Sequence, residues 1–364
     1  MDKCLNELIK ISRRVGRNPF LAQGASGNTS VKTDDGKYIF IKASGTALAN
    51  MSKNKGWRRI NLEKARAIIK NKKIAKLPEQ KREAEIAKRL LACCADNTKG
   101  NCRPSIEANL HVLLDKYVIH IHPIAVGAFL NAKNGKAELK KLFAKNKFPP
   151  LWISYANPGY SLAKKIVHLS GKYQKKYRRL PEILFLEKHG LFVSASNSVD
   201  ALNLVSKVIK KCWNKLTCPT VKQIKKPNAN EIKNVKNIIS AAAVKKKQVY
   251  YFYNKNLGPY VHQDDTGNLL KAGALNPNEI IYLKGPIIWL ENLQKNTILP
   301  KLKTPPVAFI IKNLGLFVIG SAKDSSTAQQ VITASLFMRF NASKFGGIVA
   351  LTKHEQNFIS NCGA

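Results

Sequence analysis

Two histidines that could bind a metal ion lie two residues apart in the apolar run Val118-Ile119-His120-Ile121-His122-Pro123. Side chains alternate between the two faces of a β-strand, so residues two apart project from the same face. If this run is a strand, the two imidazoles project side by side and form half of a site for a divalent ion. Two structural histidines would give the same pattern, so further ligands are needed to favour a metal site.

Two other stretches offer those ligands. His189 stands in the run from Leu186 to Val193, whose pattern is typical of two strands joined by a tight turn at Gly190. Glu107 follows Pro104, where we expect a helix over about residues 105–114, and on one face of that helix Glu107 and His111 would be neighbours. The carboxylate of Glu107 and the imidazoles of His120, His122 and His189 suit zinc and leave a position open for substrate.

Two loops of small residues could bind a phosphate group. The first contains Gly27 and Asn28, and the second is the run Lys42-Ala43-Ser44-Gly45-Thr46. Such loops present backbone N–H groups and hydroxyls to an anion because no bulky side chain blocks its approach. Plain hairpin turns have the same composition, and Asp34 to Lys37 between the two loops is itself a hairpin turn signal.

Taken in order, these stretches resemble the class II aldolase/adducin family. The resemblance rests on Gly27 to Lys32, Lys42 to Thr46, Pro104 to Glu107, His120 to Pro123 and His189 to Leu191, and it covers roughly residues 1–217. Tyr155 to Tyr160, followed by Leu162-Ala163-Lys164, looks most like the aldolase half of bifunctional rhamnulose-phosphate aldolase/alcohol dehydrogenases.

The resemblance implies a three-layer α/β/α fold around a central, mainly antiparallel sheet. It implies Zn²⁺ or another divalent ion bound by Glu107, His120, His122 and His189, with Glu107 also acting as general acid and base. Tyr155 and Tyr160 are candidates for a second acid. The positions that the resemblance implies for binding the substrate phosphate are Gly27, Asn28, Ser44, Gly45, Thr46 and Ser105.

Three functions are compatible with these residues. The resemblance implies a metal-dependent aldolase that cleaves a ketose 1-phosphate, of the rhamnulose- or fuculose-phosphate type, to dihydroxyacetone phosphate and an aldehyde. An epimerase, dehydratase or decarboxylase of a phosphorylated sugar or sugar acid would use the same ligand set. An adducin-like interaction protein without enzymatic activity is the third, although adducin-like domains lack a complete ligand set.

Composition limits the remaining classes. The 364 residues are enough for two domains, and the net charge of +40 would by itself suggest a nucleic-acid or anionic membrane partner. Because the lysines are scattered and not interleaved with aromatic residues, we expect no nucleic-acid partner. The sequence contains no apolar run long enough to indicate a membrane segment. The seven cysteines form no C-x-x-C pair, so we expect a cytoplasmic protein with reduced thiols. Family members suggest a homo-oligomer, and the lack of a Gly-x-Gly-x-x-Gly motif predicts no nicotinamide site.

The second half of the chain repeats part of the first. Residues 309–318 follow the pattern of residues 184–193, with Leu314 where His189 stands, and we expect residues 280–286 to correspond to residues 118–123. We therefore predict a catalytic domain over residues 1–218, a linker over 219–228, and over 229–364 a degenerate second copy without a metal site. We expect Phe309, Ile311 and Phe317 to cover the first domain.

Overall fold

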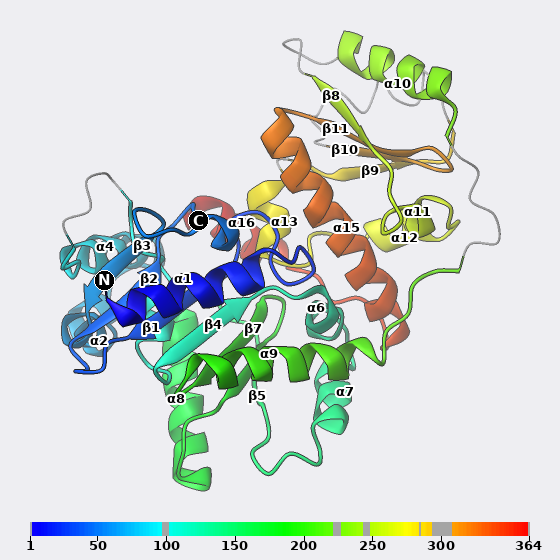
Figure 1. Cartoon of the computed structure of the whole chain (residues 1–364). Coiled ribbons are helices and arrows are strands. Elements are labelled where there is room, and N and C mark those ends of the chain that lie inside the picture. The colour runs from blue at the N-terminus through cyan, green and yellow to red at the C-terminus, as the bar shows by residue number, and fades with distance from the viewer. Residues whose placement is uncertain are drawn as a thin grey trace.

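The computed structural model describes residues 2–96, 102–220, 227–242, 248–283, 285–292 and 308–362. The chain forms two sheets, a seven-stranded sheet in the first half and a four-stranded sheet in the second (Figure 1). Within these residues, no helix combines the length and the apolar character needed to cross a membrane.

The large sheet has the order β3-β2-β1-β4-β7-β6-β5, and of its neighbouring pairs only β5 and β6 run parallel. This confirms the mainly antiparallel sheet. Its strands are β1 (Asn28–Lys32), β2 (Tyr38–Lys42), β3 (Trp57–Asn61), β4 (Tyr117–Ile121), β5 (Leu151–Ile153), β6 (Ile183–Leu186) and β7 (Gly190–Ala195).

Helices cover both faces of this sheet, which confirms the three-layer α/β/α architecture. One face is covered by α1 (Lys3–Gly16), α6 (Ile124–Leu130), α7 (Gly135–Leu142) and α9 (Ser198–Trp213). The other is covered by α2 (Leu62–Lys70), α3 (Lys72–Ala75), α4 (Glu79–Ala92), α5 (Ala108–His111) and α8 (Tyr160–Tyr177). A 3₁₀ turn, η1 (Leu48–Asn50), packs beside α1.

Strand β4 shows how the sequence positions the first histidine. Ile119 and Ile121 point into the core under α1 and α9, and Val118 points into the opposite core. His120 therefore shares its face with Val118, on the side of α5 and α8. The period of two places the imidazole at the edge of an apolar core, where the ring stacks on Phe192 with centroids 4.0 Å apart.

The second half repeats four strands of the first. The small sheet has the order β8-β11-β10-β9, with β8–β11 and β11–β10 antiparallel and β10–β9 parallel, and β4-β7-β6-β5 has the same order and directions. Its strands are β8 (Val249–Phe252), β9 (Ile287–Leu290), β10 (Ala308–Ile311) and β11 (Gly315–Ile319). The helices are α10 (Ala229–Ala242), α11 (Gly258–Val261), α12 (Thr266–Leu270), α13 (Pro277–Tyr282), α15 (Ala322–Lys344) and α16 (Lys353–Cys362).

The turn between β6 and β7 and the turn between β10 and β11 have the same backbone conformation and the same kind of hydrogen bond. The N–H of Lys188 donates to the carbonyl of Leu130 at 3.1 Å, and the N–H of Asn313 donates to that of Val261 at 3.0 Å. Both donors adopt the left-handed conformation, with φ of 54° and 61°. The repeat extends to these four strands and their turn, and counterparts of β1, β2 and β3 are absent from the described part of residues 227–362.

The predicted correspondence of residues 280–286 to the His-x-His run was wrong. Residues 280–282 form the end of helix α13, which begins after its N-cap residue Asn276. Strand β8 pairs with β11 as β4 pairs with β7. In this register Tyr251 and Tyr253 occupy the positions of His120 and His122.

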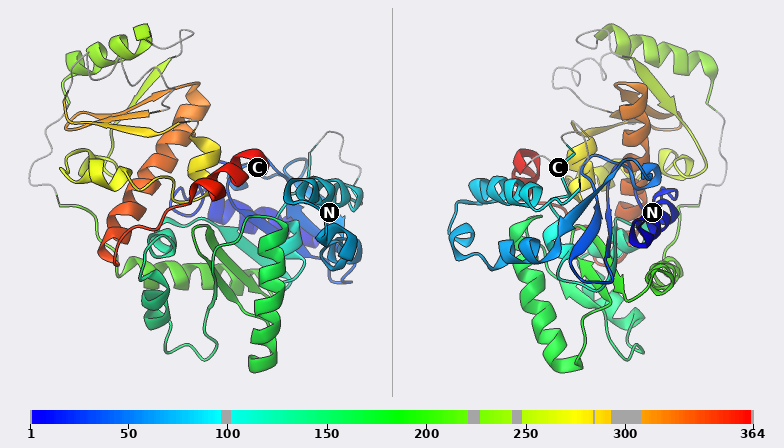
Figure 2. Two further views of the ribbon diagram at one scale, coloured as in Figure 1. Left: turned by 180° about the vertical axis from the view of Figure 1, so that it is seen from behind. Right: turned by 60° about the vertical axis from the view of Figure 1, so that its left-hand side comes forward.

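The prediction that Phe309, Ile311 and Phe317 cover the first domain was also wrong. Together they pack with Val235 and Ile239 of α10, because these strand positions face the outer helix of the second half. Helix α15 of the second half crosses beside α6 of the first half and forms part of the contact between the halves (Figures 1 and 2).

Aromatic pairs occupy that contact. Trp213 stacks on Phe337 with ring centroids 5.1 Å apart, and Phe129 stacks on Phe345 at 4.7 Å. The predicted linker 219–228 lies partly outside the described residues, so the domain boundaries stay a prediction.

Candidate metal centre and active site

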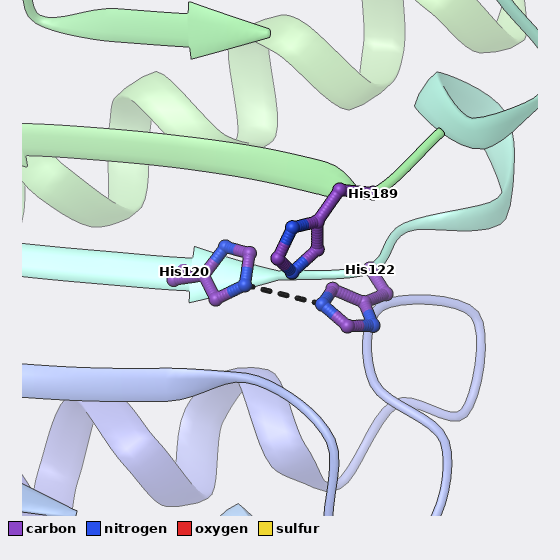
Figure 3. Close-up of side chains that lie close together, drawn as sticks. All are labelled: His120, His122 and His189. Carbon is purple, nitrogen blue, oxygen red and sulfur yellow. Dashed lines mark hydrogen bonds between the residues drawn. The ribbon is translucent and has the colours of Figure 1, made fainter. Parts of the chain in front are cut away.

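Three imidazoles meet at the ends of three strands (Figure 3). His120 lies in β4, His122 follows that strand, and His189 lies in the turn between β6 and β7. One ring nitrogen of each lies within 4.8 Å of the others. The Nε2 atoms of His120 and His122 are 3.1 Å apart.

The surrounding acceptors determine which ring nitrogens carry protons. Nδ1 of His120 lies 3.1 Å from the carbonyl of Leu191, and Nδ1 of His122 lies 2.8 Å from Oδ1 of Asn278. Because both partners accept, we infer that both Nδ1 atoms are protonated and both Nε2 atoms carry lone pairs. Two lone pairs at 3.1 Å repel each other unless a cation lies against them. The donor set therefore fits a divalent ion.

Glu107 joins this cluster. Its Oε1 lies 3.3 Å from Nε2 of His189, and its Oε2 lies 3.5 Å from Nε2 of His120. Burial alone would raise the pKa of Glu107, but attraction to the protonated forms of the adjacent imidazoles, that of His120 first, and a hydrogen bond from His189 hold it well below its ordinary value. The carboxylate is therefore ionised and can serve as a ligand or as a base.

The predicted helix over residues 105–114 is shorter than expected. Helix α5 spans only Ala108–His111, and Glu107 precedes it with φ −80° and ψ 0°. His111 points away from the cluster, and its Nδ1 lies 2.8 Å from Oγ of Ser30. The N–H of His111 donates to the carbonyl of Glu107 at 3.3 Å, as the predicted helical spacing requires, but the ring of His111 bonds to Ser30 of β1 and not to the carboxylate of Glu107.

The two histidines on β4 and its extension are neutral at ordinary pH. Burial, which disfavours the charged form, lowers the pKa of His120 well below its usual value and that of His122 to about 4. Neutral imidazoles are the form that binds a metal ion.

A cavity of about 1100 Å³ opens beside the cluster. Of the residues predicted to bind phosphate, the structure brings five to its wall, namely Gly27, Asn28, Ser44, Gly45 and Ser105. Nδ2 of Asn28 donates to Oγ of Ser105 and, at 3.2 Å, to Oε2 of Glu107. The predicted phosphate loop therefore contacts the predicted metal ligand directly.

Thr46 is absent from this lining, and its methyl group faces Gly56. Its carbonyl instead accepts from Nζ of Lys42 at 2.8 Å, and that ammonium also donates to the carbonyl of Ala25 at 3.0 Å. Lys42 thus ties the two small-residue loops together. Burial lowers the pKa of Lys42 to about 8.

The two tyrosines considered as a second acid lie away from the cavity wall. The ring of Tyr155 lies under Nζ of Lys188, 4.3 Å from its centroid, and Tyr160 lies under the guanidinium of Arg82. Tyr282 of α13 does line the cavity, and its hydroxyl accepts from the N–H of Ala25 at 2.9 Å.

The second half supplies a whole wall of the cavity, which the sequence analysis missed. They come from helices α13, α15 and α16, from the end of strand β11 and from the turn that follows it, and their residue types do not indicate a binding site. They are Pro277, Asn278, Ile281, Tyr282, Val318, Ile319, Gly320, Ser321, Lys323, Asp324, Thr327, Gln330, Phe358 and Ile359.

The sequence of residues 6–213 matches the family described as class II aldolase and adducin N-terminal domain. No curated protein matches the chain significantly.

Solved structures similar to this one include the N-terminal class II aldolase domain of a conserved protein from Thermoplasma acidophilum, with 23% identity, 59% of this chain and 94% of that chain covered, and a TM-score of 0.47. A sugar-phosphate aldolase from Thermotoga maritima has 15% identity, coverage of 58% and 93%, and a TM-score of 0.43. An L-fuculose-1-phosphate aldolase from Thermus thermophilus has 17% identity, coverage of 57% and 92%, and a TM-score of 0.32.

The family match spans more than half of the chain, over the residues that carry the histidine cluster, Glu107 and the small-residue loops. The protein therefore belongs to the class II aldolase and adducin N-terminal domain family.

Proposed function

We propose that the protein is a zinc-dependent aldolase that cleaves a ketose 1-phosphate, of the rhamnulose- or fuculose-phosphate type, to dihydroxyacetone phosphate and an aldehyde. The position of Glu107 carries this proposal. Its carboxylate lies between the imidazole cluster and Asn28 of the predicted phosphate loop, beside the large cavity. A substrate held by its phosphate would therefore present nearby carbon atoms to a base and a metal ligand set at once.

A divalent ion bound by His120, His122 and His189 supplies Lewis-acid stabilisation of the negative charge that develops when C3–C4 breaks. Glu107, being ionised, can remove a proton from the hydroxymethyl carbon of dihydroxyacetone phosphate, which becomes C3 of the ketose, in the direction of condensation. In cleavage the C4 hydroxyl releases its proton to solvent as the C3–C4 bond breaks and the aldehyde forms, and Glu107 returns a proton to C3, because the two directions share one transition state.

The small-residue loops orient the substrate. Gly27 has φ of +78°, and a β-carbon there would lie 2.8 Å from the carbonyl oxygen of His120, so the loop lies close against β4. A substrate phosphate bound by these loops would hold C3 of the ketose within reach of Glu107. The free energy of phosphate binding would thus be used to position the reacting carbon. The net charge of +40 favours the approach of an anionic sugar phosphate. Assembly into a homo-oligomer stays a prediction.

A product assay tests the proposal. Purified protein is incubated with a panel of ketose 1-phosphates and phosphorylated sugar acids, and release of aldehyde, release of carbon dioxide and epimer formation are each measured. We expect aldehyde and dihydroxyacetone phosphate from at least one ketose 1-phosphate. Formation of carbon dioxide or an epimer, with no aldehyde from any substrate, would contradict aldolase activity and indicate a decarboxylase or an epimerase that uses the same metal ligands.

A further inference from the structure

One of the three clustered histidines is held by the second half of the chain. Nδ1 of His122 lies 2.8 Å from Oδ1 of Asn278, a residue 156 positions away in helix α13. Asn278 is buried, with 3% of its surface exposed. His120, in contrast, bonds to the backbone of the neighbouring strand β7.

A chain of hydrogen bonds determines the direction of this contact. Nε2 of Gln23 donates to the carbonyl of Pro19 at 2.6 Å, which leaves Oε1 of Gln23 as an acceptor. Nδ2 of Asn278 donates to that oxygen at 3.0 Å. The amide of Asn278 is thereby oriented with its oxygen toward His122, so that the imidazole must carry its proton on Nδ1.

The rest of the second half holds Asn278 in place. The side chain of Asn276 caps α13 by accepting from the N–H of Asn278 at 3.0 Å. The next residue, Glu279, forms a buried ion pair with Arg339 of α15 at 2.8 Å. Helix α15 in turn packs on α6 of the first half. The position of Asn278 therefore depends on the docking of the second half.

We propose that the second half controls the metal affinity of the site through Asn278, which acts as a positioning residue for His122. Its acceptor oxygen keeps the proton on Nδ1 and the lone pair of Nε2 directed at the cluster. Without that acceptor the ring rotates and populates the tautomer protonated on Nε2, which cannot bind a metal through that atom. The inference rests on the proposed metal site.

The test compares two variants of the full chain. Asn278→Leu removes the acceptor, and we expect it to weaken Zn²⁺ binding, measured by competition with a chelator, by about 10- to 100-fold. Asn341→Leu is the matched control. Asn341 is also a buried asparagine that bridges the halves, accepting from the N–H of Thr217 at 3.0 Å, but it does not contact the cluster. We expect its Zn²⁺ affinity to stay within about threefold of wild type.

A conservative variant and a metal-free measurement separate positioning from general damage. Asn278→Asp keeps an acceptor, because a carboxylate oxygen also accepts from an imidazole N–H, and we expect it to bind Zn²⁺ more tightly than Asn278→Leu. Nitrogen NMR of the metal-free protein should show His122 protonated on Nδ1 in wild type and in Asn341→Leu, and a mixture of tautomers in Asn278→Leu.

The outcomes distinguish this inference from the proposed function. Wild-type affinity in Asn278→Leu, or equal losses in the two leucine variants, would overturn the role of Asn278 while leaving the metal site intact. If wild-type protein binds no Zn²⁺, or if Zn²⁺ binding survives replacement of both His120 and His122, the proposed metal site itself is wrong.

Discussion

Lys188 and Glu355 form an ion pair that joins the two halves beside the candidate metal centre. Nζ of Lys188 lies 2.5 Å from Oε2 and 2.7 Å from Oε1 of Glu355, and the two side chains are only 8% and 15% exposed. Lys188 directly precedes His189. The turn that carries His189 is thus held by helix α16 of the second half as well as by its own strands.

Removal of one partner should destabilise the protein. We expect Glu355→Gln to lower the free energy of unfolding by about 3 kcal/mol, because Lys188 keeps a charge that is buried without its partner. Glu138→Gln removes the partner of the exposed Lys141, 2.8 Å away, and should cost less than about 0.5 kcal/mol. Denaturant unfolding of both variants measures the difference, and equal losses would contradict the buried character of the pair.

The metal ligands should be separable from other histidines. We expect purified protein to carry about one divalent ion per chain, and His189→Ala to lose it, because two imidazoles and a carboxylate bind less tightly than the full set. His262→Ala is the control, since its ring bonds to Tyr253 and Asn313 of the second half. Metal content by elemental analysis decides, and full retention in His189→Ala would remove that residue from the ligand set.

Glu107 should be needed for proton transfer more than for metal binding. We expect Glu107→Gln to retain the ion on its three imidazoles, while exchange of the hydroxymethyl C–H protons of dihydroxyacetone phosphate with solvent deuterium slows by about two to four orders of magnitude. Proton NMR follows the exchange. Undiminished exchange in the variant would mean that another group moves the proton.

The turn at Gly190 leaves no room for a side chain. A β-carbon there would lie 2.7 Å from Cδ2 of His122 and 2.7 Å from the carbonyl oxygen of Ile121. We expect Gly190→Ala to displace His122, to weaken Zn²⁺ binding and to destabilise the fold by about 1–3 kcal/mol. Gly171→Ala in α8 meets nothing within 4 Å and should stabilise the protein by about 0.5–1 kcal/mol. Thermal unfolding with and without Zn²⁺ compares the two.

His111 should make the fold sensitive to acid. Burial lowers its pKa to about 3, whereas an unfolded histidine titrates near pH ~6.5, so between these values the unfolded chain binds more protons. Stability from this residue is complete above pH ~6.5 and falls as the pH drops toward ~3, by up to about 1.4 kcal/mol per pH unit. In His111→Gln, which can keep a hydrogen bond to Ser30, denaturant unfolding at about pH 7 and about pH 5 should show a smaller loss than wild type. An identical pH slope would contradict this.

Local patterns in the sequence predicted the elements that carry the cluster. Strands β6 and β7 flank the turn that the run from Leu186 to Val193 indicated, and His120 shares a face of β4 with Val118 as a period of two requires. These features follow from backbone geometry over a few residues, so they can be inferred without knowing the path of the chain. The ligand roles of these residues stay a prediction.

Contacts between distant segments could not be predicted in this way. Glu107 precedes a helix of only one turn, and the ring of His111 bonds to Ser30 of β1, and neither fact has a local signal. Asn278 contacts His122 across 156 positions because α15 docks the second half on α6. Hydrophobic periodicity predicts on which face of its helix or strand a side chain lies. The residues that this face contacts depend on how the helices and strands pack in the tertiary structure. The residue types and spacing therefore determined the candidate ligands, and the tertiary structure decided that the second half completes their cavity.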